Sequence, residues 1–181
     1  DCGQCFRFDP VGNGIEGVAF GKVLYFEQEN IDKVKIYGIT KSEFDERFCR
    51  YLALDEDYSA VDSDIITRLN DDDTIKKAIK YGSGIRILRQ DGWEALCSFI
   101  ISQNNNIPRI KKIIENMSRE FGEKIDETHY AFPTAEALYN AGVDKIFELK
   151  TGCRAKYIYD AAEKVVTGKI DLSSVDKMTT D

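Results

Sequence analysis

The stretch of sequence that decides the fold lies in the middle of the chain and reads WEALCSFIISQNNNIPRIKKIIENMSREF over residues 93–121. Apolar residues recur at intervals of three and four on both sides of the asparagines, which is the spacing of a helix that buries one face. They are Trp93, Leu96, Cys97, Ile100 and Ile101 before the asparagines, and Ile110, Ile113, Ile114, Met117 and Phe121 after them. The pattern predicts two buried helices joined by a short polar loop. Pro108 falls in the first turn of the second helix, where its missing N–H costs no hydrogen bond.

The first forty residues have the pattern of antiparallel β-structure. Residues 23–26 form a short aromatic and β-branched run, and apolar residues alternate with polar ones around Phe8 and around Ile36. Glycine-containing turns separate these segments at residues 12–14 and at Gly21. An antiparallel meander is therefore expected.

From residue 40 onward the pattern is helical. Residues 40–43 read Thr-Lys-Ser-Glu, which resembles a capping box. Apolar residues then recur at helical spacing within residues 44–52, 65–69 and 75–79, and a later helix is expected to begin near Arg154.

The charged residues divide the chain at about residue 75. Residues 1–75 carry 8 basic and 17 acidic side chains, whereas residues 76–181 carry 17 basic and 15 acidic ones. Within residues 76–112 the balance is 8 basic to 2 acidic, so a chain of net charge −7 still offers a local basic surface to a phosphate backbone. A solvated helix face has the same composition. We expect an α+β fold in two domains: an acidic N-terminal antiparallel β-rich lobe with helices (1–75), followed by an all-α helical lobe (76–181).

The cysteines and the chain ends narrow the class of protein. Five irregularly spaced cysteines make an odd number, which favours a reducing compartment over a disulfide framework. Cys2 and Cys5 have the spacing of half a zinc site, but no second pair follows and His129 is the only histidine, so neither a metal nor a cofactor is expected.

No apolar run approaches the roughly 20 residues that cross a bilayer. The chain opens at Asp1 without a signal peptide, and it ends in a polar tail; we expect a piece of a longer protein.

Three groups of residues are candidates for a binding site. The first is Asn104, Asn105 and Asn106 with Arg109 three residues beyond, because amide and guanidinium groups can read base edges. The alternative is a polar loop whose asparagine caps the next helix. The second group, residues 152–156, has an alternative as a plain helix start with surface cations. The third, around Gly3, has an alternative as a strand after a glycine. The residues alone leave these alternatives open.

Taken together, these segments resemble the 8-oxoguanine DNA glycosylase family of the helix-hairpin-helix glycosylase superfamily. The resemblance is carried by Gly3-Gln4-x-Phe6-Arg7, Arg86-Ile87-Leu88-Arg89-Gln90-Asp91, Phe99-Ile100-x-Ser102-x-Asn104-Asn105-Asn106-Ile107-x-Arg109-Ile110, Phe132-Pro133 and Gly152-x-Arg154-Ala155-x-Tyr157. The asparagine segment is the most specific of them. The resemblance implies base-excision repair: recognition of 8-oxoguanine opposite cytosine in double-stranded DNA, and its extrusion from the stack.

The resemblance also implies residue roles. Asn104 matches the asparagine that fills the space vacated by the flipped base. Arg109 and Arg154 match the arginines that hydrogen-bond the orphaned cytosine, whose acceptor edge suits a guanidinium. Gly3 matches the glycine whose carbonyl accepts the N7–H found on 8-oxoguanine and not on guanine. Asn105, Asn106 and Cys153 are expected to support the loop or to contact DNA. The family usually has, at the position of Cys153, an aromatic side chain that wedges into the stack of DNA bases.

The implied chemistry is that of a DNA N-glycosylase with AP lyase activity, in which a lysine attacks the sugar C1′ to form a Schiff base and an aspartate supports that step. Both belong to a Gly-rich helix-hairpin-helix segment that these 181 residues do not contain, so no catalytic residue is expected in this chain. The alternatives are a non-catalytic DNA-lesion-binding module and a plain helical interaction module. A monomer is expected, in the cytoplasm of a bacterium or archaeon (at the nucleoid) or in a eukaryotic nucleus.

Overall fold

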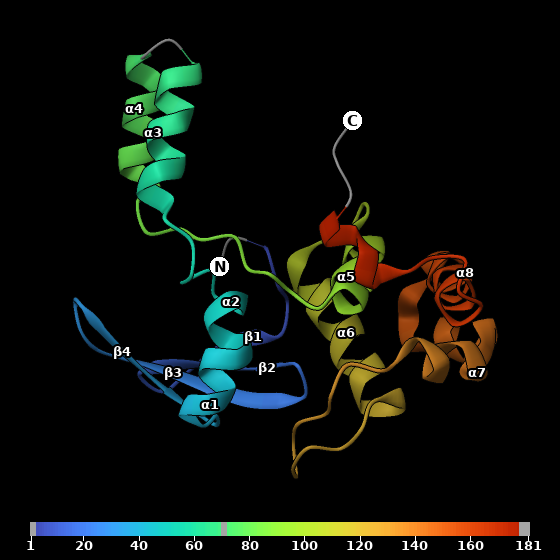
Figure 1. Ribbon diagram of the computed structural model, residues 1–181. Coiled ribbons are helices and arrows are strands. Elements are labelled where there is room, and N and C mark those ends of the chain that lie inside the picture. The colour runs from blue at the N-terminus through green and yellow to red at the C-terminus, as the bar shows by residue number, and fades with distance from the viewer. Residues whose placement is uncertain (1–2, 70–71, 178–181) are drawn as a thin grey trace. The chain divides into compact units, whose positions relative to one another are not determined.

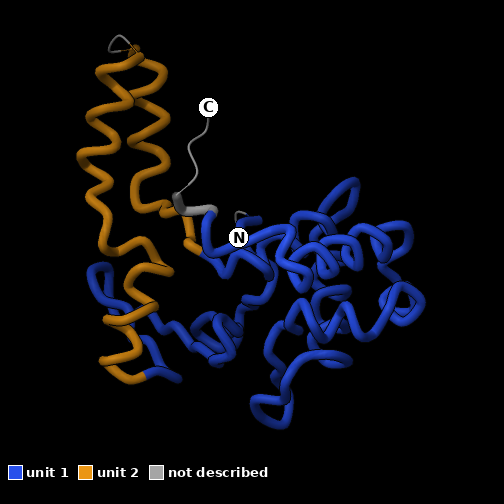
Figure 2. The backbone as a smooth tube through the Cα atoms, turned by 45° about the vertical axis from the view of Figure 1, so that its right-hand side comes forward, with its two compact units in different colours: residues 1–39, 90–181 blue, residues 40–89 orange. Residues whose placement is uncertain are grey.

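The computed structural model describes residues 3–69 and 72–177. They form two compact units, one drawn from residues 3–39 and 90–177 and the other from residues 40–69 and 72–89 (Figure 2). The domain boundary that we expect at residue 75 stays a prediction. Cys2, half of the zinc spacing considered above, lies outside the described residues.

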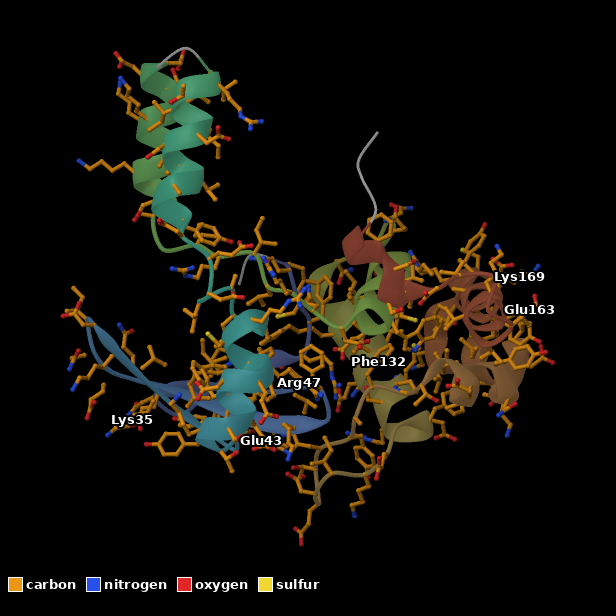
Figure 3. All side chains as sticks on the ribbon, in the orientation of Figure 1. Lys35, Glu43, Arg47, Phe132, Glu163 and Lys169 are labelled. Atoms are coloured by element: carbon orange, nitrogen blue, oxygen red, sulfur yellow. The ribbon has the colours of Figure 1, made fainter. Side chains whose placement is uncertain are left out.

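A four-stranded antiparallel sheet begins the first unit (Figure 1). Its strands are β1 (Phe8–Val11), β2 (Gly14–Ala19), β3 (Lys22–Asn30) and β4 (Lys33–Tyr37), and they pair in the order β1-β2-β3-β4. The short apolar run predicted at residues 23–26 lies in β3, where Leu24 is fully buried. Lys35, labelled in Figure 3, lies on β4 and pairs with Glu29 at 2.9 Å. The predicted meander is confirmed.

The rest of the first unit is helical. It contains α5 (Gly92–Ser102), α6 (Ile107–Phe121), α7 (Ala135–Ile146), the π-helical η2 (Phe147–Thr151), α8 (Arg154–Val166) and the 3-10 helix η3 (Leu172–Lys177). The two predicted apolar stripes meet in one core. Its most buried members are Cys97, Ile101, Ile113, Ile114, Met117, Leu138, Ile146, Ala155, Ile158 and Ala162. Phe132, labelled in Figure 3, packs against this core. Burial of this apolar surface is the main force holding α5 to α8 together.

Helix α7 is an element that the sequence reasoning above does not name. Thr134 caps it by accepting a hydrogen bond from the backbone N–H of Ala137 at 3.1 Å. It lies beside α8 (Figure 1), and the rings of Tyr139 and Tyr159 stack with centroids 5.5 Å apart. The signal was present, because Pro133 and Thr134 precede an alanine-rich segment in the order typical of a helix start.

Two charged contacts tie the sheet to the helices within the first unit. Lys111 of α6 donates to the Phe8 carbonyl at 2.7 Å and pairs with Asp9 at 2.6 Å. Arg7 lies 3.8 Å from Glu94 of α5 and donates to the Tyr130 carbonyl. The sheet and the helical core are therefore anchored to each other by the largely buried Arg7–Glu94 pair and by the more exposed Lys111–Asp9 pair.

The second unit holds α1 (Lys41–Glu43), the π-helical η1 (Phe44–Phe48), α2 (Cys49–Tyr51), α3 (Tyr58–Arg68) and α4 (Asp73–Tyr81). The predicted capping box is present, with Thr40 and Glu43 bonding reciprocally. Antiparallel strands followed by helices confirm the expected α+β class. Across residues 3–69 and 72–177, no helix has both the length and the apolar character needed to cross a bilayer.

Candidate functional site

The loop between α5 and α6 is held by two of its three asparagines. Asn105 donates from its side-chain nitrogen to the Ile101 carbonyl at 3.0 Å and accepts the Asn106 N–H at 3.0 Å. Asn106 caps α6 by accepting the backbone N–H of Arg109 at 3.0 Å. The capping alternative is therefore correct for Asn106, and Asn105 supports the same loop from within.

Asn104 differs from its two neighbours. Its φ of +48° lies in the left-handed region, which asparagine enters more readily than most residues that have a side chain. Its side chain is exposed and has no hydrogen bond to any residue of the described chain. The loop therefore presents one free amide group, held on a constrained backbone.

Arg154, the first residue of α8, joins this loop across fifty positions of the sequence. Its Nε donates to the Gln103 carbonyl at 3.2 Å, and its Nη2 donates to the carbonyls of Gln103 and Asn104, the latter at 3.1 Å. Its Nη1 reaches the Thr151 carbonyl at 3.4 Å. The planar guanidinium thus holds the end of the asparagine loop against the turn that precedes α8.

Arg109 approaches the same turn from α6. Its Nη2 donates to the Lys150 carbonyl at 3.4 Å, and its side chain is exposed. Lys150 itself has a left-handed backbone, with φ of +65°. Thr151 is fully buried and donates its hydroxyl to the Ile146 carbonyl at 2.8 Å. The structure therefore brings together Arg109, Arg154 and the Asn104 loop.

Cys153 lies at the N-cap of α8 and makes no side-chain capping bond. Its thiol is free and exposed. The neighbouring Lys156 and Tyr157 are exposed as well, whereas Ala155 and Ile158 are buried in the core. Cys153 thus lies on the outward face of α8, at the edge of the arginine cluster.

Gly3 stands apart from that cluster. Its φ is +72°, and a Cβ built on it would meet no atom within 4 Å. Within the described chain no residue donates a hydrogen bond to its carbonyl. Its neighbour Gln4 accepts a hydrogen bond from the Gln90 side chain, which ties this segment to the start of α5. No hydrogen bond joins Gly3 to the asparagine loop in the described structure.

Sequence reasoning did not identify the backbone acceptors of this site. The carbonyls of Gln103, Asn104, Lys150 and Thr151 accept the arginine hydrogen bonds. Every residue has a carbonyl, so no residue type signals this role, and lysine gives no sign of a left-handed backbone. No cluster of potential metal ligands occurs among the described residues.

The buried Arg7–Glu94 pair is a second feature of the first unit. Burial raises the pKa of Glu94 to about 7, although Arg7 opposes this shift. Burial also lowers the pKa of Arg7, while Glu94 acts in the opposite sense. Arg7 belongs to one of the family segments, but sequence reasoning gave no partner for it.

Comparison with known proteins identifies the family of this chain. The chain matches the family model of the 8-oxoguanine DNA glycosylase N-terminal domain over residues 1–96, and that of the HhH-GPD superfamily base excision DNA repair proteins over residues 97–180. A curated relative, the N-glycosylase/DNA lyase of Saccharomyces cerevisiae, is 41% identical over 101 residues, which are 53% of this chain and 27% of the relative.

Two solved structures are similar over nearly all of this chain. MBOgg1 in complex with a low-affinity DNA ligand is 41% identical with a TM-score of 0.88, and the match covers 98% of this chain and 61% of that one. The Clostridium acetobutylicum 8-oxoguanine glycosylase/lyase in complex with double-stranded DNA containing cytosine opposite 8-oxoguanine is 39% identical with a TM-score of 0.89, and the match covers 99% of this chain and 61% of that one. The chain thus spans less than two thirds of these relatives. It belongs to the 8-oxoguanine DNA glycosylase family, within the HhH-GPD superfamily of base excision DNA repair proteins.

Proposed function

We propose that this chain is the DNA-recognition part of a base-excision repair enzyme that removes 8-oxoguanine opposite cytosine from double-stranded DNA. The observation that carries the proposal is the contact of Arg154 with the carbonyls of Gln103 and Asn104. This contact joins two motifs of the family into one surface that presents Arg109, Arg154 and a free asparagine amide. A relative of high structural similarity was solved in complex with double-stranded DNA that contains cytosine opposite 8-oxoguanine.

On this proposal the surface reads the cytosine that the flipped lesion leaves behind. Asn104 enters the vacated space, because within the described residues its side-chain amide is the one in the loop that makes no hydrogen bond. Arg109 and Arg154 donate to the O2 and N3 acceptors of cytosine. Arg154 must then exchange at least part of its bonds to the loop carbonyls for bonds to the base, so DNA binding and loop conformation are coupled.

The damaged base is checked elsewhere, at Gly3. A carbonyl with no internal donor can accept the N7–H of 8-oxoguanine, and guanine cannot supply that hydrogen bond. The loss of one such bond corresponds to about 1–3 kcal/mol of discrimination. Because the lesion must leave the stack to reach a protein carbonyl, the proposal includes base flipping.

The bond-breaking chemistry is assigned to residues outside these 181. We propose that a lysine and an aspartate in a further helix-hairpin-helix segment supply the Schiff-base glycosylase and lyase steps. The relatives are longer, since this chain covers 61% of each solved structure described above. The enzyme is proposed to act as a monomer, at the nucleoid of a bacterium or archaeon or in the nucleus of a eukaryote.

Single-turnover excision by the intact protein on an 8-oxoguanine:cytosine duplex tests the proposal. Release of the base and strand cleavage are expected, and borohydride is expected to trap a covalent protein–DNA complex through the Schiff base. Tight binding without base release would instead identify the chain as part of a non-catalytic lesion sensor. Equal affinity for lesion-containing and undamaged duplexes would show that it is neither.

A further inference from the structure

The outward face of α8 beside the arginine cluster carries an aromatic ring with no partner. Tyr157 is 62% exposed, and no ring contact or hydrogen bond holds its side chain within the described residues. The other tyrosine of the helix, Tyr159, is half-buried and stacks on Tyr139. Packing therefore accounts for an aromatic side chain at Tyr159 but not for one at Tyr157.

The position of Tyr157 follows from helix geometry. It lies four residues after Cys153, so these two exposed side chains share one face of α8, and it lies three residues after Arg154, which borders that face. The opposite face is buried through Ala155 and Ala162. Tyr157 is thus one helical turn beyond the residue that opens the helix, and close to the guanidinium that holds the Asn104 loop.

Cys153 is too small to replace a stacking base, whereas a tyrosine ring is flat, large and costs little entropy to fix. Aromatic side chains stack on any base because every base has a π-face. The exposed Lys150 and Lys156 lie on either side of Arg154 in the sequence and can pair with the phosphates that flank a stacked base.

We propose that Tyr157 is the residue that stacks on the DNA bases next to the orphaned cytosine, in place of the wedge that Cys153 does not provide. This inference rests on the proposed function, because it needs the arginine cluster to face cytosine. Tyr157 is a positioning and specificity residue: it keeps the neighbouring base pair in place while Arg109 and Arg154 bind the cytosine.

The test compares Tyr157→Leu with Tyr157→Phe in the intact protein. The DNA is a duplex with a tetrahydrofuran abasic analogue opposite cytosine, which the enzyme cannot cleave, and 2-aminopurine replaces the base next to that cytosine. Tyr157→Leu is expected to weaken binding on the order of tenfold and to abolish the fluorescence change on binding. Tyr157→Phe keeps the ring and is expected to retain both.

Three controls make the result specific. Tyr81→Leu removes a tyrosine that is 94% exposed in the other compact unit, and it is expected to bind like the unaltered protein. Stacking adds no ion pair, so Tyr157→Leu should leave the salt dependence of binding unchanged. The double variant Cys153→Tyr/Tyr157→Leu restores an aromatic ring on the same face and is expected to regain affinity.

Two outcomes would overturn the inference: Tyr157→Leu binding within twofold of the unaltered protein, or Tyr157→Phe losing as much affinity as Tyr157→Leu. Arg109→Ala in the same assay separates this failure from failure of the proposed function. If Arg109→Ala weakens binding and Tyr157→Leu does not, only the role of Tyr157 is wrong. If Arg109→Ala also has no effect, the cytosine-reading surface itself is wrong.

Discussion

Arg154 donates hydrogen bonds to the backbone carbonyls of Gln103 and Asn104, although about fifty residues separate it from them. The same guanidinium reaches the carbonyl of Thr151. In the DNA-free protein most of its donors therefore hold the loop and the turn together. On the proposed function, a cytosine that binds Arg154 must compete with these carbonyls for the same donors.

Replacing Arg154 by lysine tests whether DNA binding depends on the planar guanidinium, which can donate several hydrogen bonds at once. Lysine keeps the charge but has a single ammonium, which cannot reach two carbonyls and a base edge in the same plane. Arg154→Lys is expected to weaken binding to a lesion:cytosine duplex by roughly tenfold or more, in line with about 1–3 kcal/mol per bidentate contact. Binding to a lesion:adenine duplex should fall less. Fluorescence anisotropy with both duplexes measures the difference.

The matched control is Arg68→Lys, since Arg68 forms an exposed ion pair with Asp64 in α3. It is expected to leave both affinities unchanged. An equal loss of affinity for the two duplexes with Arg154→Lys would show that Arg154 acts only through phosphate or loop structure.

The asparagines of the loop are expected to separate stability from binding. Asn105→Ala removes the bonds to the Ile101 carbonyl and from the Asn106 N–H, and it should cost about 1–2 kcal/mol of unfolding free energy. Asn104→Gly removes a side chain without partners at a backbone where φ is +48°, which glycine accepts freely. It should leave the unfolding free energy within about 1 kcal/mol of its original value and weaken lesion binding.

Urea unfolding and DNA binding measured on both variants check this division. The reverse pattern would contradict the assignment of roles within the loop. In that case Asn104→Gly would unfold at a lower urea concentration than the unaltered protein, and Asn105→Ala would bind DNA weakly but keep its unfolding free energy.

Much of the fold could be predicted from the sequence because the relevant signals are local. The apolar stripes on both sides of the asparagines, and the capping box at Thr40, are read directly from residue spacing. The predicted meeting of the asparagine loop with Arg154 came from family resemblance, since no local pattern links residues fifty positions apart.

The remaining features have no local signal. The left-handed backbone at Lys150 lies within the π-helical turn η2, next to the buried Thr151. Lysine has no preference for that conformation, so tertiary contacts decide it. Helix α7 is different, because Thr134 at its N-cap is a local start signal that the sequence does contain.

The core of the helical part gives a prediction of stability. Ile113 on α6 is 1% exposed, so Ile113→Ala should cost about 2–5 kcal/mol through lost burial and the cavity left behind. Ile107 on the same helix is 42% exposed, and Ile107→Ala should cost under about 1 kcal/mol. Urea unfolding of both variants measures the contrast, and equal costs would mean that the face of α6 is assigned wrongly.

The pH dependence of stability should report on Glu94. Its side chain is 16% exposed, and burial raises its pKa to about 7 even though Arg7 lies 3.8 Å away. The unfolded carboxyl loses its proton at a lower pH, so the native state binds the extra proton in between. The resulting stability is complete below about pH 4.5 and is lost as the pH rises through about 7. Glu94→Gln stays neutral at every pH, so its unfolding free energy relative to the unaltered protein should rise by about 1–3 kcal/mol between pH 5 and pH 8. Urea unfolding at closely spaced pH values measures this difference, and two parallel curves would show that Glu94 titrates alike in the folded and unfolded chains.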